Sequence, residues 1–410
     1  MKSRALPIKV GVAAAAIAVS AAACGSNSSG GGTAAGDNSN QPTAASADAT
    51  ATQAAELRTG LDTLFREHVD LTGFTVQTAA ISGIGSTQTA AALKTLDSNT
   101  VALADAIGSI YGPAARDAFL KMWRAHIGFF VNYTKGLASH DKHLVSQSQS
   151  QLAGYKRDFA TFLAGATQIP ANAIATELQG HIQTLESAIK AILTGSKTAG
   201  AKLEMAAEHM DGTAQALASG IAKEKGLTGN ADGDAAGLRA ALTGLLIQHV
   251  AQTGAVIQSL VATGSLSSPQ TTGAISALDQ NTVDLGKAIG SLYGGDAQQA
   301  FLKMWRAHIG FFVTYTEGIA GNDAAKVRQA KHQLAGYQKQ FGDFLGSATG
   351  LPGSAVSADL QGHVQTLEAA IKAILAKSPS ASTKIAMAES HMAGTAQVLA
   401  KAIAAQKDLS

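Results

Sequence analysis

The sequence predicts an all-α protein made of two tandem antiparallel helical bundles, each of about six helices. Apolar residues recur every three or four positions along most of the chain, as they do on the buried side of a helix. The dense alternation of Val, Ile and Thr that predicts strands does not occur. The chain is also duplicated, because residues 118–131, AFLKMWRAHIGFFV, recur letter for letter at 300–313.

The duplication sets the predicted domain boundaries. We predict one helical module at 53–226 and a second at 234–410, each long enough to bury its own core. Gly-Asn and Asp-Gly turn signals lie between them, so we expect a hinge at 226–234.

Six apolar stripes predict the helices of the first module. They cover residues 57–71, 93–110, 119–133, 152–162, 174–192 and 203–217. Pro113 follows Gly112 and suits the first turn of the third helix, and Ile169-Pro170 precedes the fifth. The sixth stripe has smaller residues and is read as Leu203, Met205, Ala216 and Leu217.

The first residues predict an export signal at 1–23. A basic start with Lys2, Arg4 and Lys9 precedes an apolar run that is too short for a comfortable transmembrane helix. The run ends in Ala21-Ala22-Ala23-Cys24, which resembles the lipobox of bacterial lipoproteins. That resemblance implies that Cys24 becomes the mature N-terminus and carries acyl chains such as palmitate. Two such chains are enough for stable anchoring.

Residues 24–52 are predicted to be the lipidated Cys and a flexible linker of Gly, Ser, Thr, Ala, Asn and Asp. A linker of this length places the folded part about 30 Å from the membrane. No later segment is expected to span a bilayer. The sequence thus predicts an extracytoplasmic protein of the cell envelope, held on the cell membrane by lipid.

Composition narrows the classes of function. The net charge is only +2, so the concentrated basic face of a nucleic-acid-binding protein is not expected. Cys24 is the only Cys, and no activated nucleophile, acid–base pair or phosphate loop is recognisable. We therefore do not expect an enzyme, and the sequence names no protein partner.

Histidines and methionines kept in both copies are the candidate functional residues. Met122 and His126, like Met205 and His209, are four residues apart and so share a helix face. Four helices per module each place one His on an apolar stripe, which predicts imidazoles gathered in each bundle core. The full predicted metal-ligand set is His68, His126, His181, His209, Met122, Met205, Met210, His249, His308, His363, His391, Met304, Met387 and Met392.

Imidazole is a common metal ligand and thioether sulfur favours soft ions, so this set points to copper. A di-iron centre needs Glu-x-x-His, which does not occur here, and haem attachment through Cys-x-x-Cys-His does not occur either. Glu177 and Asp359 precede His181 and His363 by one turn and are expected to orient those imidazoles.

Two other interpretations of the same residues stay open. The histidines could form a structural polar network, hydrogen-bonded to Thr72 and Thr253 or to Asn99 and Asn281. They could instead line a pocket for another small ligand. The leading hypothesis is a copper-binding lipoprotein, and the alternative is a structural or protein-interaction envelope lipoprotein with no metal.

The helical part also resembles an uncharacterised family. The shared features are His-Val-x-x-Thr at 68–72, Tyr111-Gly112 at the end of the second helix, and the histidines of the third, fifth and sixth helices. The resemblance covers most of 57–225 and 238–407. It implies a helical module of secreted proteins from Gram-positive bacteria, some of which carry copper-amine-oxidase N-terminal-like modules.

Overall fold

The computed structural model describes residues 48–410, and these residues form helices and no strands, which confirms the all-α class. The predicted signal peptide and Cys24 lie outside the described residues. After a short 3-10 helix, η1 (Ala49–Ala51), the elements of the first copy are α1 (Gln53–Ser82), α2 (Thr87–Tyr111), α3 (Pro113–Ala138), α4 (Lys142–Thr167), α5 (Ala171–Leu193) and α6 (Ala199–Lys225). Those of the second copy are α7 (Asp234–Thr263), α8 (Pro269–Tyr293), α9 (Gly295–Ala320), α10 (Ala324–Thr349), α11 (Gly353–Leu375) and α12 (Ala381–Gln406).

Helix boundaries follow local chemistry that the sequence shows. Ser86 caps α2 by accepting a hydrogen bond from the Thr89 amide, and Asp141 caps α4 through the amides of residues 143 and 144. Gly112 joins α2 to α3 at a φ of 87°, a conformation that favours glycine. Pro113 then begins α3, where its missing N–H is no loss.

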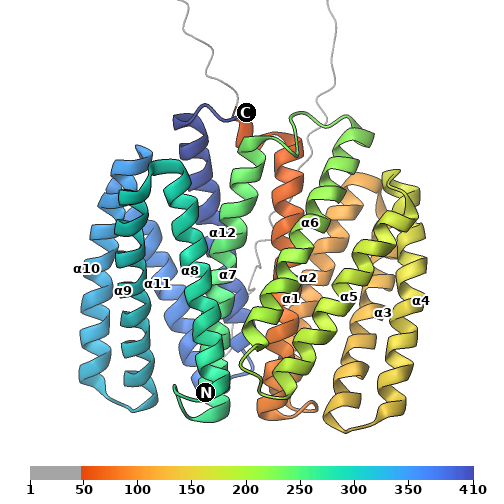
Figure 1. Cartoon of the computed structure of the whole chain (residues 1–410), viewed down its shortest axis with the longest axis horizontal. Coiled ribbons are helices and arrows are strands. Elements are labelled where there is room, and N and C mark those ends of the chain that lie inside the picture. Colours follow the sequence, from red (N-terminus) through yellow and green to blue (C-terminus); the bar gives the residue numbers. More distant parts are fainter. Residues whose placement is uncertain (1–47) are drawn as a thin grey trace, which may run out of the picture.

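Helices of each copy pack against their neighbours in sequence, and the last helix of each copy closes on the first. In this way α6 packs on α1, and α12 packs on α7. The two copies meet along α1 and α7, which run side by side at the centre of the molecule (Figure 1). Further contacts join α6 to α8 and α2 to α12.

Helices α1 and α7 are buried on most of their circumference because each packs inside its own copy and against the other. Contrary to the expectation from the sequence, one later helix, α7, is long and apolar enough to span a bilayer when only its length and composition are considered. In the structure 78% of that apolar window is buried within the protein, as in a core helix.

The predicted stripes of the first five helices lie mostly in the core, but only Leu203 and Leu217 of the sixth stripe pack there. Met205 is 58% exposed and Ala216 is exposed too. The buried face of α6 consists of Ala206, Ala207, Met210, Ala214, Leu217, Ala218 and Ile221. Its alanines let α6 approach α1 closely, and Leu203 lies directly over Gly73 of α1.

The segment between the copies, where a hinge was predicted, is fixed by hydrogen bonds to the start of α1. Its Thr228 carbonyl accepts a hydrogen bond from the Ala54 amide, and its Ala231 carbonyl accepts one from Arg58. At the other end of the chain, the Ser410 carbonyl accepts a hydrogen bond from the Ala235 amide. These contacts tie the predicted hinge to the start of α1 and to the C-terminus.

Candidate metal centre

Three of the four predicted histidines of the first copy meet in the bundle core. His68 comes from α1, His126 from α3 and His181 from α5, and each is at least 96% buried. The ring centroids are 5.4 Å apart for His68 and His126, 5.9 Å for His68 and His181, and 6.2 Å for His126 and His181. One ring nitrogen from each His lies within 4.8 Å of the others.

The second copy repeats this arrangement with His249, His308 and His363 from α7, α9 and α11. Its centroid separations are 5.3, 5.9 and 6.4 Å. The same triangle therefore forms twice, once in each copy.

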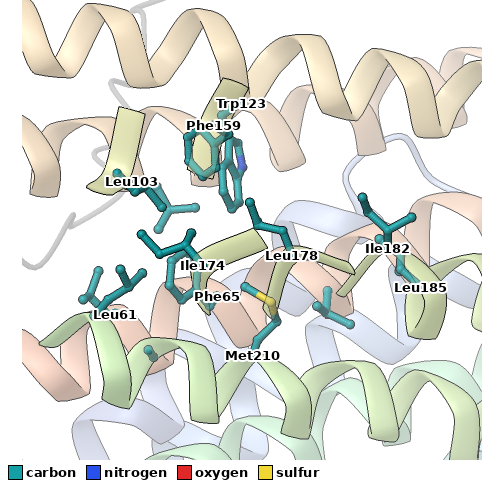
Figure 2. Close-up of a cluster of buried hydrophobic side chains, with 14 of the residues drawn as sticks. Leu61, Phe65, Leu103, Trp123, Phe159, Ile174, Leu178, Ile182, Leu185 and Met210 are labelled. Atoms are coloured by element: carbon teal, nitrogen blue, oxygen red, sulfur yellow. The ribbon is translucent and has the colours of Figure 1, made fainter. Parts of the chain in front are cut away.

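Aromatic side chains surround the imidazoles and keep polar atoms away. Tyr155 stacks on His126 with the rings 4.9 Å apart and 19° from parallel. Trp123 stands edge-on to both His126 and His68, at 4.5 and 5.1 Å. Figure 2 shows Trp123 and Phe159 together in the neighbouring apolar core. These aromatic residues lie within the predicted stripes 119–133 and 152–162, but the sequence did not predict their contacts with the histidines.

None of the six ring nitrogens in either cluster has a hydrogen-bond partner within residues 48–410. The predicted structural partners are occupied elsewhere. Thr72 donates to the His68 backbone carbonyl at 2.7 Å, and Asn99 donates to the Leu64 carbonyl and to Glu67. Thr253 and Asn281 repeat this pattern in the second copy. The hydrogen-bonded polar network expected under the structural interpretation is therefore absent from these residues.

Burial keeps these imidazoles neutral. Loss of water lowers the pKa of His68 to about 3 and that of His181 to about 4, with a smaller contribution from a neighbouring His in each case. The pKa of His126 is lowered well below its usual value for the same reasons, and the nearby Trp123 carbonyl opposes the shift without reaching hydrogen-bond geometry. Neutral imidazole is the form that binds metals.

The triangle is close to the size that one ion requires. Three nitrogens bound to one ion at about 2.0–2.1 Å lie roughly 3.5 Å apart. Starting from separations of at most 4.8 Å, each nitrogen needs to move about 0.8 Å toward the centre.

His209 and His391 do not join the clusters. His209 lies across Gly180 of α5, where an added Cβ would be 2.5 Å from its Cε1 atom, and its Nε2 atom is 2.7 Å from the Glu177 carbonyl oxygen. His391 repeats both contacts with Gly362 and Asp359. The fourth imidazole predicted for each core is thus partly exposed and held by the backbone of the neighbouring helix.

The carboxylates predicted to orient His181 and His363 lie beside other histidines. The Glu177 carboxylate lies 3.7 Å from the His209 ring, and Asp359 lies 3.7 Å from His391. Neither orients His181 or His363, whose ring nitrogens have no partner within residues 48–410.

The methionines divide into three groups. Met210 and Met392 are buried, and Met210 lines a cavity that also reaches His126 and His181. Met122 and Met304 are partly buried against the cores. Met205 and Met387 are 58% and 44% exposed, so the prediction that they point into the cores is wrong.

A second group of buried polar residues, which the sequence did not predict, lies where the copies meet. Arg66 pairs with Asp211, while the Glu389 carboxylate oxygens and one Asp70 oxygen are buried without a partner in the described part of the chain. Burial raises the pKa of Asp70 to about 7, and Arg66 opposes the shift. The other copy has apolar residues at the positions matching Arg66, Asp70 and Glu389, so a search for charges present in only one copy would have found this group.

No family model matches this chain, and no curated protein or solved structure matches it. The residues that meet in space are therefore the basis for a functional conclusion.

Proposed function

We propose that this protein is an extracytoplasmic, lipid-anchored protein that binds copper as Cu(I), one ion in each histidine cluster. The observation that supports this most directly is the pair of buried triangles, in which neutral imidazoles face one another with no hydrogen-bond partner among the described residues. A buried polar atom without a partner costs about 1–3 kcal/mol, so six in each cluster are a large cost for packing alone. A bound ion uses one nitrogen from each ring.

Charge favours Cu(I) over a divalent ion. The three ligands are neutral, and the cluster is surrounded by Trp123, Tyr155 and Phe130 rather than by carboxylates. The cost of burying an ion rises with the square of its charge, so Zn²⁺ costs about four times as much as Cu⁺. Imidazole suits copper, and the buried thioether of Met210 suits Cu(I) in particular.

Residues 1–52 support the location part of the proposal. The Ala21-Ala22-Ala23-Cys24 sequence resembles a lipobox, and lipid on Cys24 would hold the protein on the membrane. At the membrane the protein would buffer, deliver or sense copper. The alternative is a structural or protein-interaction envelope lipoprotein without metal, which the same lipid anchor would serve.

Metal titration of the mature chain, from residue 24 with Cys24→Ser, tests the proposal. The substitution removes the only thiol, so any tight Cu(I) site must come from His or Met. We expect two equivalents of Cu(I) bound against a competing chelator, one equivalent in His126→Ala, and none in the variant that also has His308→Ala. Zn²⁺ and Cu²⁺ serve as comparison ions and should bind more weakly.

The matched control is His209→Ala with His391→Ala, which removes two histidines outside the clusters. This variant should keep both equivalents. Binding no tighter than micromolar in the parent chain would reject the metal site and favour the structural alternative. Loss of binding in the control variant would reject the assignment of these ligands.

A further inference from the structure

The first copy contains a large apolar cavity of about 350 Å³ beside its histidine cluster. Its walls come from all six helices of the first copy, α1 to α6, and it extends along α3 from Ala115 to His126. Figure 2 shows part of this wall, with Phe65, Ile174, Leu178 and Met210 gathered between the helices. An apolar cavity of about 150 Å³ stays dry and binds benzene, so this one has room for a larger apolar ligand.

The second copy holds much less space at the matching end of its bundle. The matching region, whose walls include Leu242, Ile289 and Ile403, holds only about 30 Å³. Most lining residues are identical or similar in the two copies; for example, Tyr111 matches Tyr293, and Ile221 matches Ile403. The difference therefore comes mainly from how the helices are spaced.

Three positions between the fourth and fifth helices of each copy explain the spacing. The second copy has Gly342, Gly346 and Gly353 where the first has Ala160, Ala164 and Ala171. An added Cβ at Gly342 would lie 2.2 Å from the Ser357 hydroxyl, and one at Gly346 would lie 2.9 Å from the Gly353 Cα. The glycines therefore let α10 and α11 touch, whereas methyl groups keep α4 and α5 apart.

The shape of the cavity indicates the kind of ligand. The stretch of α3 from Ala115 to His126 is about 16 Å long at 1.5 Å per residue. A volume of 350 Å³ over that length gives a width of roughly 5 Å, close to the contact distance of about 4 Å between carbon atoms. That mean width suits a single hydrocarbon chain.

The open end of the cavity lies between α5 and α6, where the lining residues Thr176 and Ala216 are exposed. Thr213 and Glu177 also line this end. Hydroxyl groups suit a polar head group, and the Glu177 carboxylate disfavours an anionic one. In the second copy the larger Val398 takes the place of Ala216.

We propose that the first copy binds the acyl chain of a single-chain lipid with an uncharged head group, and that the second copy does not. The chain lies along α3 in the cavity, and the head group stays at the Thr176 and Thr213 hydroxyls. This proposal does not depend on the proposed copper function, because it needs no metal, although the cavity shares His126 and His181 with the histidine cluster.

Tryptophan fluorescence gives a direct test, because the protein has two Trp residues, Trp123 and Trp305, at matched positions. Trp123 lines the cavity. The probe is 1-monomyristoylglycerol with bromine on its acyl chain, added to the metal-free mature chain with Cys24→Ser. In a Trp305→Phe background we expect saturable quenching at one equivalent. In a Trp123→Phe background, which reports the second copy, we expect none.

Two kinds of variant close the site. Ala160→Gly, Ala164→Gly and Ala171→Gly together should bring α4 and α5 together and weaken binding at least tenfold. Ala216→Trp blocks the open end from an exposed position, so it should weaken binding without a loss of helical circular dichroism. Equal quenching of both tryptophans, or unchanged affinity in folded Ala216→Trp, would overturn the proposal.

Discussion

Replacing a cluster histidine by leucine should stabilise the metal-free protein, which is the opposite of the usual effect of a core substitution. His126 is 1% exposed, and neither of its ring nitrogens has a partner within residues 48–410. Two such atoms cost about 2–6 kcal/mol, while the lost stacking on Tyr155 is worth about 1 kcal/mol. His126→Leu should therefore raise the free energy of unfolding by roughly 3 kcal/mol. For a folded unit of about 150–250 residues, which is the size range of one copy, this change corresponds to a rise in melting temperature of about 6–12 °C.

The effect should grow as the pH falls. The pKa of His126 is well below 6.5 in the folded protein and near 6.5 in the unfolded chain. Below pH 6.5 the unfolded chain therefore binds a proton that the folded protein excludes, so acid destabilises the parent. The parent loses about 1.4 kcal/mol per pH unit through this one group, and His126→Leu does not.

The assay is urea unfolding followed by circular dichroism at pH 7.5 and 5.5, with a chelator present. His209→Leu is the matched control. It removes a hydrogen-bonded imidazole, so it should lower the free energy of unfolding by about 1 kcal/mol. With Cu(I) added, the order of parent and His126→Leu should reverse, because only the parent gains both ions. A metal-free His126→Leu protein that is less stable than the parent at both pH values would refute this reasoning.

Three other predictions concern features outside the clusters. Glu389→Ala introduces the residue that the first copy has at the matching position, Ala207, and should stabilise the protein as the pH rises above about 4.5, because burial raises the folded pKa of Glu389 while the unfolded group ionises freely. The gain is about 1.4 kcal/mol per pH unit until the pH reaches the folded pKa. Urea unfolding between pH 5 and 8 would show a flat difference if this is wrong. Gly180→Ala should cost about 1–3 kcal/mol, since the new Cβ would lie 2.5 Å from His209, and Gly212→Ala, with nothing within 4 Å, is its control in thermal unfolding. Cys24→Ser in the full chain should abolish incorporation of labelled palmitate and release the protein from membranes, and retained label would reject the lipid anchor.

The sequence alone determined the helical class and the residues that could carry function. A three-to-four residue rhythm and capping residues such as Ser86 and Asp141 are local, so they can be read without knowing the fold. The duplication indicated which histidines both copies keep, and these were the candidate ligands. It could not separate His126, inside a cluster, from His209, outside it, because both follow a Met by four residues.

Tertiary structure decided which of those residues meet. His68, His126 and His181 come together because α1, α3 and α5 bring their inner faces to one level, which depends on how helices are shifted along one another. The alanine-rich face of α6 turned Met205 outward, since small side chains packed on α1 better than the predicted stripe. The size of the cavity depends on how far apart the helices around it lie, and the spacing between helices appears only in the tertiary structure.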